Sequence, residues 1–285
     1  MSDAQSTAAA ADIRDPTTLA ALAHRLGDAA RAETLSRFRT AAAGADNKAG
    51  PGAFDPVTAA DRAAERAIRT LLAAERPADA ILGEEEAAAA GTSGLTWVID
   101  PIDGTRAFIS GLPTWGTLIA LDDGTRGILG LVDHPVTDER FLGLPGHGAW
   151  TTWRGETGPA AVRATRRLAE ATLMTTDPGL FQGAEAAAFA ALRAQCRLTR
   201  YGADCYAYAM LAIGQIDLVV ESRLQAYDIA APAALIQAAG GTVTDWRGRD
   251  CRWGGQVVAA ATPELAAEAR AHLAPVAAAT SPAGA

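Results

Sequence analysis

The chain has 285 residues, of which 49% are hydrophobic and 20% are charged, so it can bury a sizeable core as one large domain or two packed halves. Its formal net charge is −8, and no basic cluster exceeds a pair such as Arg166–Arg167. This acidic balance argues against a surface for nucleic acid or anionic lipid.

The cysteines and the amino terminus bear on the compartment. Cys196, Cys205 and Cys251 are odd in number and form no Cys-x-x-Cys pair, which argues against a disulfide framework or a zinc site. The amino terminus lacks the basic start and leucine-rich core of a signal peptide, and no apolar run approaches a membrane span. We therefore expect a cytoplasmic protein with no membrane partner.

The first part of the chain is predicted to begin with helices. Residues 1–11 and 276–285 are rich in small residues and are expected to be frayed tails. A helix is predicted from Asp15–Pro16 to about Arg39, and a second from Ala59 to Ala74, because large apolar residues recur at helical spacing.

The middle of the chain is predicted to be rich in β-structure. Short apolar runs at 80–82 and 95–99 each lead into carboxylates, so two strands would deliver acids at their carboxyl ends. Residues 115–133 are typical of a hairpin that turns at 122–124, and 141–153 of further antiparallel strands broken at Gly146 and Gly148.

The last part of the chain alternates between the two kinds of element, which indicates an α/β class. Helices are predicted at 184–194, 204–214 and 228–239, and strands at 197–200, 217–221 and 242–245. We expect one compact unit of two packed halves, residues 12–155 and residues 156–275.

The most informative motif is Asp100-Pro101-Ile102-Asp103-Gly104-Thr105. Two carboxylates three residues apart across a proline-fixed turn can converge on one point, with the Ile102 carbonyl between them, and hard divalent cations prefer such oxygen ligands. Gly104 and Thr105 would open a short helix whose free N–H groups suit phosphate. The alternative is ordinary turn chemistry.

Other acids are ambiguous when each is taken alone. Glu84 and Glu85 follow a predicted strand but also suit a solvated helix start, and Asp228 suits the N-cap of the following helix. Taken alone, Asp61 is better explained as an acid on a helix surface.

The ordered set of these residues is more specific, and it resembles the inositol monophosphatase family over residues 15–260. The set comprises Lys48, Asp55-Pro56-Val57-Thr58-Ala59-Ala60-Asp61, Gly83-Glu84-Glu85, Asp100 to Thr105, Tyr227-Asp228-Ile229-Ala230-Ala231 and Gly240-Gly241.

The resemblance implies the layered α/β/α/β/α sugar-phosphatase fold, a phosphate monoester substrate, Mg²⁺ (two or three ions per site) and a homodimer. It implies that Glu84, Asp100 and the Ile102 carbonyl hold one Mg²⁺, and that Asp100, Asp103 and Asp228 hold a second. Asp61 and Thr105 would orient the attacking water, with Glu84 also among the catalytic residues. Asp103, Gly104 and Thr105 would bind the phosphate.

Covalent phosphatase mechanisms fit poorly. A cysteine nucleophile needs Arg six residues later, where this chain has Gly202, Leu211 and Val257, and Asp100 to Asp103 is one residue too long for Asp-x-Asp-x-Thr. His134 and His147 are expected in loops, and the four histidines lack metal-ligand spacing.

Two further acids indicate the substrate. Glu221 lies seven residues before Asp228, at the family's spacing for a substrate-contacting acid, and Asp204 falls where inositol-specific members carry a small residue. A second carboxylate beside Glu221 would favour a substrate with a positively charged head, since charge-assisted hydrogen bonds are strong. Asp228 is also expected to bind the substrate. The segments 202–206 and 112–121 resemble the histidinol-phosphatase branch, which implies histidinol phosphate.

Several alternatives stay open. Asp204 suits a helix N-cap, Glu221 suits a strand end that faces water, and the tyrosines at 201, 206, 208 and 227 suit a core. An inositol or broad sugar phosphatase is the nearest alternative function. A regulatory binding protein on this scaffold is a different class, against which the intact carboxylates argue.

Overall fold

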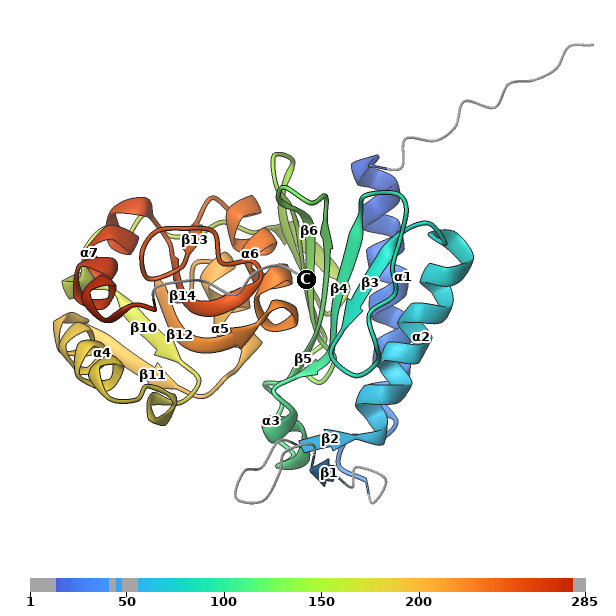
Figure 1. The fold of residues 1–285 in the computed structure, drawn as a ribbon, viewed down its shortest axis with the longest axis horizontal. Helices are drawn as coiled ribbons and strands as arrows, with labels where there is room; N and C mark the ends of the chain where they lie inside the picture. The colour runs from blue at the N-terminus through green and yellow to red at the C-terminus, as the bar shows by residue number, and fades with distance from the viewer. Residues whose placement is uncertain (1–13, 41–44, 48–55, 279–285) are drawn as a thin grey trace, which may run out of the picture.

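The protein is described by a computed structural model that covers residues 14–40, 45–47 and 56–278. Lys48, Asp55, the whole expected tail of residues 1–11 and residues 279–285 of the other expected tail lie outside the described residues. The structure confirms the predicted α/β class, because helices and two mixed sheets alternate in five layers (Figure 1).

The outer layer on one side consists of two long helices, α1 (Pro16–Leu35) and α2 (Ala59–Glu75). Asp15 caps α1 as predicted, since its Oδ2 accepts a hydrogen bond from the Thr18 N–H at 2.7 Å, but the helix ends at Leu35 rather than near Arg39. The short strands β1 (Ala45–Asn47) and β2 (Pro56–Thr58) pair before α2.

The next layer is a seven-stranded sheet in the order β3 to β9. Its strands are β3 (Ala80–Gly83), β4 (Thr96–Asp103), β5 (Gly116–Asp122), β6 (Gly127–His134), β7 (Glu139–Leu144), β8 (Gly148–Trp153) and β9 (Glu156–Pro159). Only β3 and β4 are parallel, and the other pairs in this sheet are antiparallel. The predicted division at 155/156 falls in the β8–β9 turn, so β9 extends this sheet.

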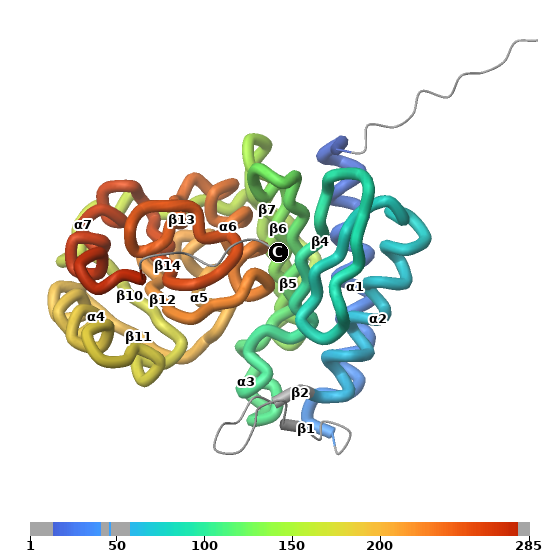
Figure 2. The backbone as a smooth tube through the Cα atoms, in the orientation of Figure 1, coloured from blue at the N-terminus to red at the C-terminus, as the bar shows by residue number. Residues whose placement is uncertain are grey.

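The five-stranded sheet has the order β11-β10-β12-β14-β13. Its strands are β10 (Thr172–Thr175), β11 (Leu198–Tyr201), β12 (Leu218–Gln225), β13 (Thr242–Thr244) and β14 (Gly254–Ala260). The helices α5 (Cys205–Ala212) and α6 (Ala226–Ala238) lie between the two sheets, and α4 (Ala184–Gln195) and α7 (Pro263–Leu273) cover the far face (Figures 1 and 2).

Helix α6 forms the middle of the molecule, and its residues from Ile229 to Ile236 are all buried. Two glycines of the seven-stranded sheet allow its backbone to approach closely. A Cβ placed on Gly130 would lie 2.2 Å from the Ala231 carbonyl oxygen, and one on Gly143 would lie 2.4 Å from the Leu235 Cα. Side chains at these two positions would therefore force α6 away from β6 and β7.

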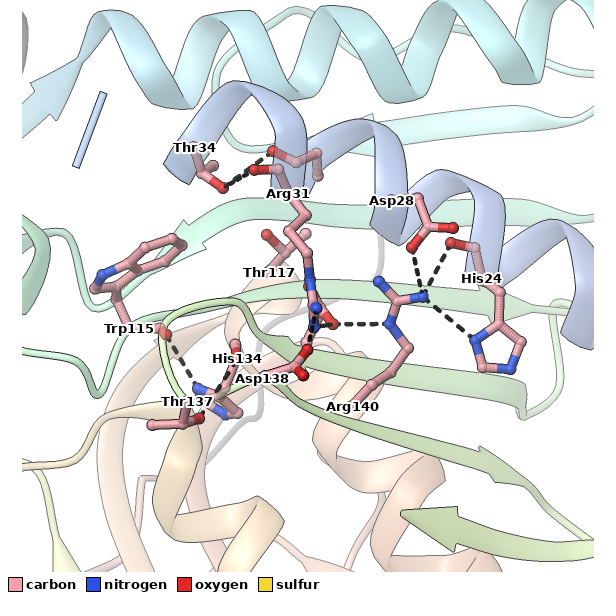
Figure 3. Close-up of polar contacts among 12 residues, drawn as sticks. His24, Asp28, Arg31, Thr34, Trp115, Thr117, His134, Thr137, Asp138 and Arg140 are labelled. Carbon is pink, nitrogen blue, oxygen red and sulfur yellow. Dashed lines mark hydrogen bonds and ion pairs between the residues drawn. The ribbon is translucent and has the colours of Figure 1, made fainter. Parts of the chain in front are cut away.

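A buried ion-pair network fixes α1 to the same sheet (Figure 3). The fully buried Asp133 carboxylate on β6 accepts hydrogen bonds from Arg31 of α1 at 2.7 Å and from Arg140 of β7 at 2.7 Å. Arg140 also pairs with Asp28 of α1 at 2.8 Å. The burial of the Asp133 charge is thus compensated by two guanidinium groups.

Of the two histidines expected in loops, one lies elsewhere. His134 is not a loop residue: it ends β6, is fully buried, and its Nδ1 lies 3.0 Å from the Trp115 carbonyl oxygen (Figure 3). Burial lowers the pKa of His134 to about 4, so the ring is neutral near pH 7. His147 lies in the β7–β8 turn, as predicted.

The expected carboxyl-terminal tail also begins too early. Val276 and Ala277 pack on the core of the second sheet, and Arg247 donates hydrogen bonds to the carbonyls of Ala277 at 2.7 Å and Ala278 at 3.0 Å. Across the described ranges, no helix combines the length and apolar character needed to span a bilayer.

Candidate active site

The end of β4 carries the first two acids of the site. A bulge interrupts its pairing with β5 between Asp100 and Asp103, so both carboxylates leave the regular sheet at this point. The Ile102 N–H donates to Asp100 Oδ1 at 3.0 Å, and the Thr117 hydroxyl donates to the Pro101 carbonyl at 2.8 Å. The turn predicted from Pro101 is therefore fixed on both sides.

Asp228 joins these two acids from the first turn of α6. Carboxylate oxygens of Asp100, Asp103 and Asp228 all lie within 4.8 Å of one another. Asp228 also belongs to a capping box, because its Oδ2 accepts a hydrogen bond from the Gln225 N–H at 2.6 Å. The helix start and the acid cluster thus use the same side chain.

Glu84 reaches the cluster because β3 and β4 are parallel and in register, with Gly83 opposite Ile99. Its N–H donates to the Ile99 carbonyl at 3.2 Å, one residue before Asp100. The carboxylate of Glu84 acts directly on the ionisation of Asp100. The structure therefore brings together the four predicted acidic ligands.

The electrostatics of the cluster fit a hard divalent cation. Burial and the charges of Glu84, Asp103 and Asp228 raise the pKa of Asp100. Burial, Asp204 and Asp228 raise the pKa of Asp103, although the Cys205 N–H, which donates to its Oδ2 at 2.7 Å, opposes this. Converging carboxylates that repel one another are stabilised by a bound cation with oxygen preference.

The Ile102 carbonyl and the start of α3 (Thr105–Ile109) lie beside Asp103. The Thr105 hydroxyl donates to the Ile102 carbonyl at 3.1 Å, and that oxygen keeps a second lone pair. Gly104 precedes α3 with a φ of 80°, a conformation that favours glycine. The predicted short helix after Gly104 is thus present.

Asp61 is a fully buried residue and not an acid on a helix surface. It forms a capping box at the start of α2, in which its Oδ2 accepts a hydrogen bond from the Thr58 N–H at 2.9 Å and another from the Thr58 hydroxyl. Its predicted role with Thr105 in orienting water stays a prediction.

Asp204 lies at the site in a strained backbone. Its backbone has a φ of 48° and a ψ of −132°. The two preceding residues also have positive φ, 74° at Gly202 and 111° at Ala203. Asp204 occupies the N-cap position of α5, as the alternative interpretation predicted, but its side chain forms no capping hydrogen bond. A Cβ on Gly104 would lie 2.9 Å from Asp204 Oδ2, which places this carboxyl against the Asp103–Thr105 turn. Such strain in non-glycine residues is typical of functional sites.

Burial raises the pKa of Asp204 to about 6, and Arg106 opposes the shift. Glu221 is 2% exposed, so it does not face water. The Thr176 N–H donates to Glu221 Oε1 at 2.6 Å and the Thr175 hydroxyl to Oε2 at 3.1 Å. Burial raises its pKa to about 7, and the charge of Asp204 adds to this.

Some residues near the site were not identified from the sequence. Glu65 of α2 is fully buried and accepts hydrogen bonds from the loop that carries Glu84. Its spacing of four residues from Arg69 was the available signal. Of the tyrosines, Tyr208 is buried in the core, and the Tyr206 hydroxyl donates to Glu139 at 2.8 Å.

Comparisons with known proteins agree with this geometry. The family model described as the inositol monophosphatase family matches residues 15–279. A bifunctional phosphatase, IMPL2 of Arabidopsis thaliana chloroplasts, is 42% identical over 211 residues, which cover 73% of this chain and 60% of that protein. A histidinol-phosphatase of Streptomyces coelicolor is 37% identical over 235 residues, which cover 80% of this chain and 86% of that protein.

A solved structure supports the same assignment. An inositol monophosphatase from Zymomonas mobilis superposes with a TM-score of 0.77 and is 39% identical, over 90% of this chain and 98% of the other. The matched span includes both sheets and every acid described above. The chain therefore belongs to the inositol monophosphatase family, and it is a phosphatase of that family.

Proposed function

We propose that the chain is a Mg²⁺-dependent phosphatase whose substrate is histidinol phosphate, which it hydrolyses to histidinol and phosphate. The carrying observation is the pair of additional acids, the buried Glu221 and the partly buried Asp204, next to the cluster of Asp100, Asp103 and Asp228. The charge of Asp204 raises the pKa of Glu221 and the pKa of Asp103. A phosphatase site with two additional carboxylates favours an ester that carries a positive group.

The residues fit Mg²⁺ by their chemistry, because all the donors are oxygens. Glu84, Asp100 and the Ile102 carbonyl would hold one ion, and Asp100, Asp103 and Asp228 would hold another, with Asp100 shared. When bound, such ions neutralise charge on the phosphoryl group and lower the pKa of a coordinated water.

The chain's own residues would bind and orient the substrate. The start of α3, at Asp103, Gly104 and Thr105, would present N–H groups to phosphate oxygens. Asp61 and Thr105 would orient the attacking water, with the Thr105 hydroxyl exchanging its bond to the Ile102 carbonyl for one to water. Hydrolysis would be direct, without a covalent intermediate.

The substrate head would lie toward the five-stranded sheet. Histidinol phosphate carries an amine and an imidazole. Glu221 in the middle of β12 and Asp204 before α5 could accept hydrogen bonds from both. Each charge-assisted bond contributes roughly 1.5 to 3 kcal/mol. A relative that is named a histidinol-phosphatase supports this choice.

A second candidate is the hydrolysis of inositol 1-phosphate or of a range of sugar phosphates. It is favoured by the inositol monophosphatase of known structure, whose sequence identity to this chain is 39%, about as high as the 37% of the histidinol-phosphatase. We further propose a homodimer, by family resemblance, and a cytoplasmic location, where the free thiols of Cys196, Cys205 and Cys251 would stay reduced.

The test compares kcat/KM with Mg²⁺ for histidinol phosphate, inositol 1-phosphate and fructose 1,6-bisphosphate. A preference of about 100-fold for histidinol phosphate, roughly 2.7 kcal/mol, would support the proposal. Asp204→Asn should lower kcat/KM for histidinol phosphate at least tenfold. It should change kcat/KM for inositol 1-phosphate less. Glu170→Gln, which removes an exposed acid, is the control. A higher kcat/KM for another ester than for histidinol phosphate would overturn the substrate assignment but not the proposed phosphatase activity.

A further inference from the structure

Glu65 is a fully buried carboxylate that lies beneath the loop carrying Glu84. The Glu85 N–H donates to its Oε2 at 2.8 Å, and the Glu86 N–H donates to its Oε1 at 3.2 Å. A carboxylate that accepts two backbone hydrogen bonds in a dry environment holds that backbone more firmly than water would. The carboxylate thus holds the two residues that follow Glu84.

Gly83 shows how closely the carboxylate approaches this loop. A Cβ on Gly83 would lie 2.0 Å from Glu65 Oε1, so only glycine can occupy the position while Glu65 stays in place. On the other side, the Glu84 N–H is bonded to the Ile99 carbonyl of β4. The backbone of Glu84 is therefore fixed between β4 and Glu65.

Arg69 compensates the charge of Glu65 one helical turn later. Its Nε donates to Glu65 Oε1 at 2.8 Å, and its Nη2 donates to the Glu86 carbonyl at 3.2 Å. Its side chain is 14% exposed, so the pair is largely excluded from water. Glu65 and Arg69 hold the loop by its N–H groups and its carbonyl at once.

We propose that Glu65 and Arg69 are positioning residues, which fix Glu84 in the orientation that a metal ion requires. This inference rests on the proposed function of Glu84 as a metal ligand. Residues that orient a ligand without touching the ion typically change metal affinity 10- to 100-fold when they are substituted. If the pair were purely structural, its substitution would lower the stability of the protein without changing its metal affinity.

The test is a titration of the full-length protein with Mn²⁺, in which free Mn²⁺ is followed by electron paramagnetic resonance. Mn²⁺ prefers the same oxygen ligands as Mg²⁺. Glu65→Gln keeps the shape of the side chain and should raise the dissociation constant about tenfold. Arg69→Lys keeps the charge but loses the bond to the Glu86 carbonyl, so it should give a smaller increase and serves if Glu65→Gln does not fold.

The matched control is Glu75→Gln, which removes an exposed ion pair with Arg25 at the other end of α2 and should leave Mn²⁺ affinity unchanged. Unchanged affinity in Glu65→Gln, with a lower melting temperature, would overturn this inference and leave the metal site standing. No Mn²⁺ binding by the wild-type protein would overturn the proposed metal site and this inference together. In activity assays, the Mg²⁺ concentration for half-maximal rate should rise more than kcat falls.

Discussion

Glu221 illustrates at the scale of one residue how burial changes the properties of an acid. Its carboxyl is 2% exposed, and two threonines of the β10 end hold it by hydrogen bonds. Its pKa is nevertheless raised to about 7, because the loss of hydration exceeds the effect of these bonds. Between about pH 4.5 and pH 7, Glu221 therefore keeps its proton in the folded protein but releases it in the unfolded chain.

This retained proton predicts a pH dependence of stability. Without metal, the free energy of unfolding should fall as pH rises from about 4.5 to about 7, since the folded state binds more protons in that range. The contribution is roughly 3 kcal/mol, at about 1.4 kcal/mol per pKa unit. Glu221→Gln should remove it, so that the variant is more stable than the wild type above pH 7.

Melting temperatures measured with a chelator between pH 4.5 and 8 check this prediction. Glu170→Gln, an exposed acid, should follow the wild-type curve. Parallel curves for Glu221→Gln and the wild type would show that Glu221 ionises normally in the folded protein.

At the scale of elements, the contact of α6 with the seven-stranded sheet positions Asp228. Gly130 and Gly143 give the helix backbone direct access to β6 and β7. Because Asp228 is in the first turn of α6, a shift of this helix moves one carboxylate of the cluster relative to the two on β4. Packing and site geometry are therefore coupled through α6.

Gly130→Ala should lower both stability and activity. The added methyl group would overlap the Ala231 carbonyl, and such overpacking typically costs about 1 to 3 kcal/mol. We expect kcat to fall at least tenfold as Asp228 is displaced. The control is Gly127→Ala on the same strand, whose methyl group would meet the Ala234 Cβ at 3.4 Å, an ordinary contact. Equal melting temperatures and equal kcat for the two variants would contradict the coupling.

The sequence allowed the prediction of features that depend on local chemistry. The turn at Pro101, the cap at Asp15 and the short helix after Gly104 depend on neighbouring residues and were found as predicted. The alternation after residue 160 was also recognisable, although β10, β14 and α7 were not assigned.

Features that depend on tertiary packing could not be predicted in the same way. His134 is polar and lies next to a proline, yet it is buried, because α5 covers the end of β6. Glu65 was not singled out from the sequence, because its burial depends on the docking of the loop after β3 against α2. Of the four predicted metal-ligand acids, Asp100 and Asp103 were indicated by a local motif, whereas Glu84 and Asp228 were identified only by family resemblance.

At the scale of the whole molecule, the acid cluster joins chain segments that are far apart in sequence. Asp100 and Asp103 belong to the seven-stranded sheet, whereas Asp228 follows β12 of the other sheet. An ion that binds all three stabilises the folded state only, because the unfolded chain does not hold them together.

Magnesium should therefore raise the melting temperature. At 100 times the dissociation constant the gain is about 2.7 kcal/mol, or about 5 to 10 °C for a domain of this size. Asp228→Asn should abolish most of the shift, and calorimetric scans with Mg²⁺ and with a chelator would measure it. A full shift in the variant would mean that the ion binds without the contribution of α6.

The position of α6 between the two sheets has a consequence for biosynthesis. When residues up to 160 have left the ribosome, the seven-stranded sheet is complete, but α6, the helix that covers its inner face, has not yet been made. Translation adds roughly 5 to 20 residues per second, so this apolar face stays open for several seconds before α6 emerges. Association of nascent chains, and the need for chaperones, should therefore be greatest in that interval.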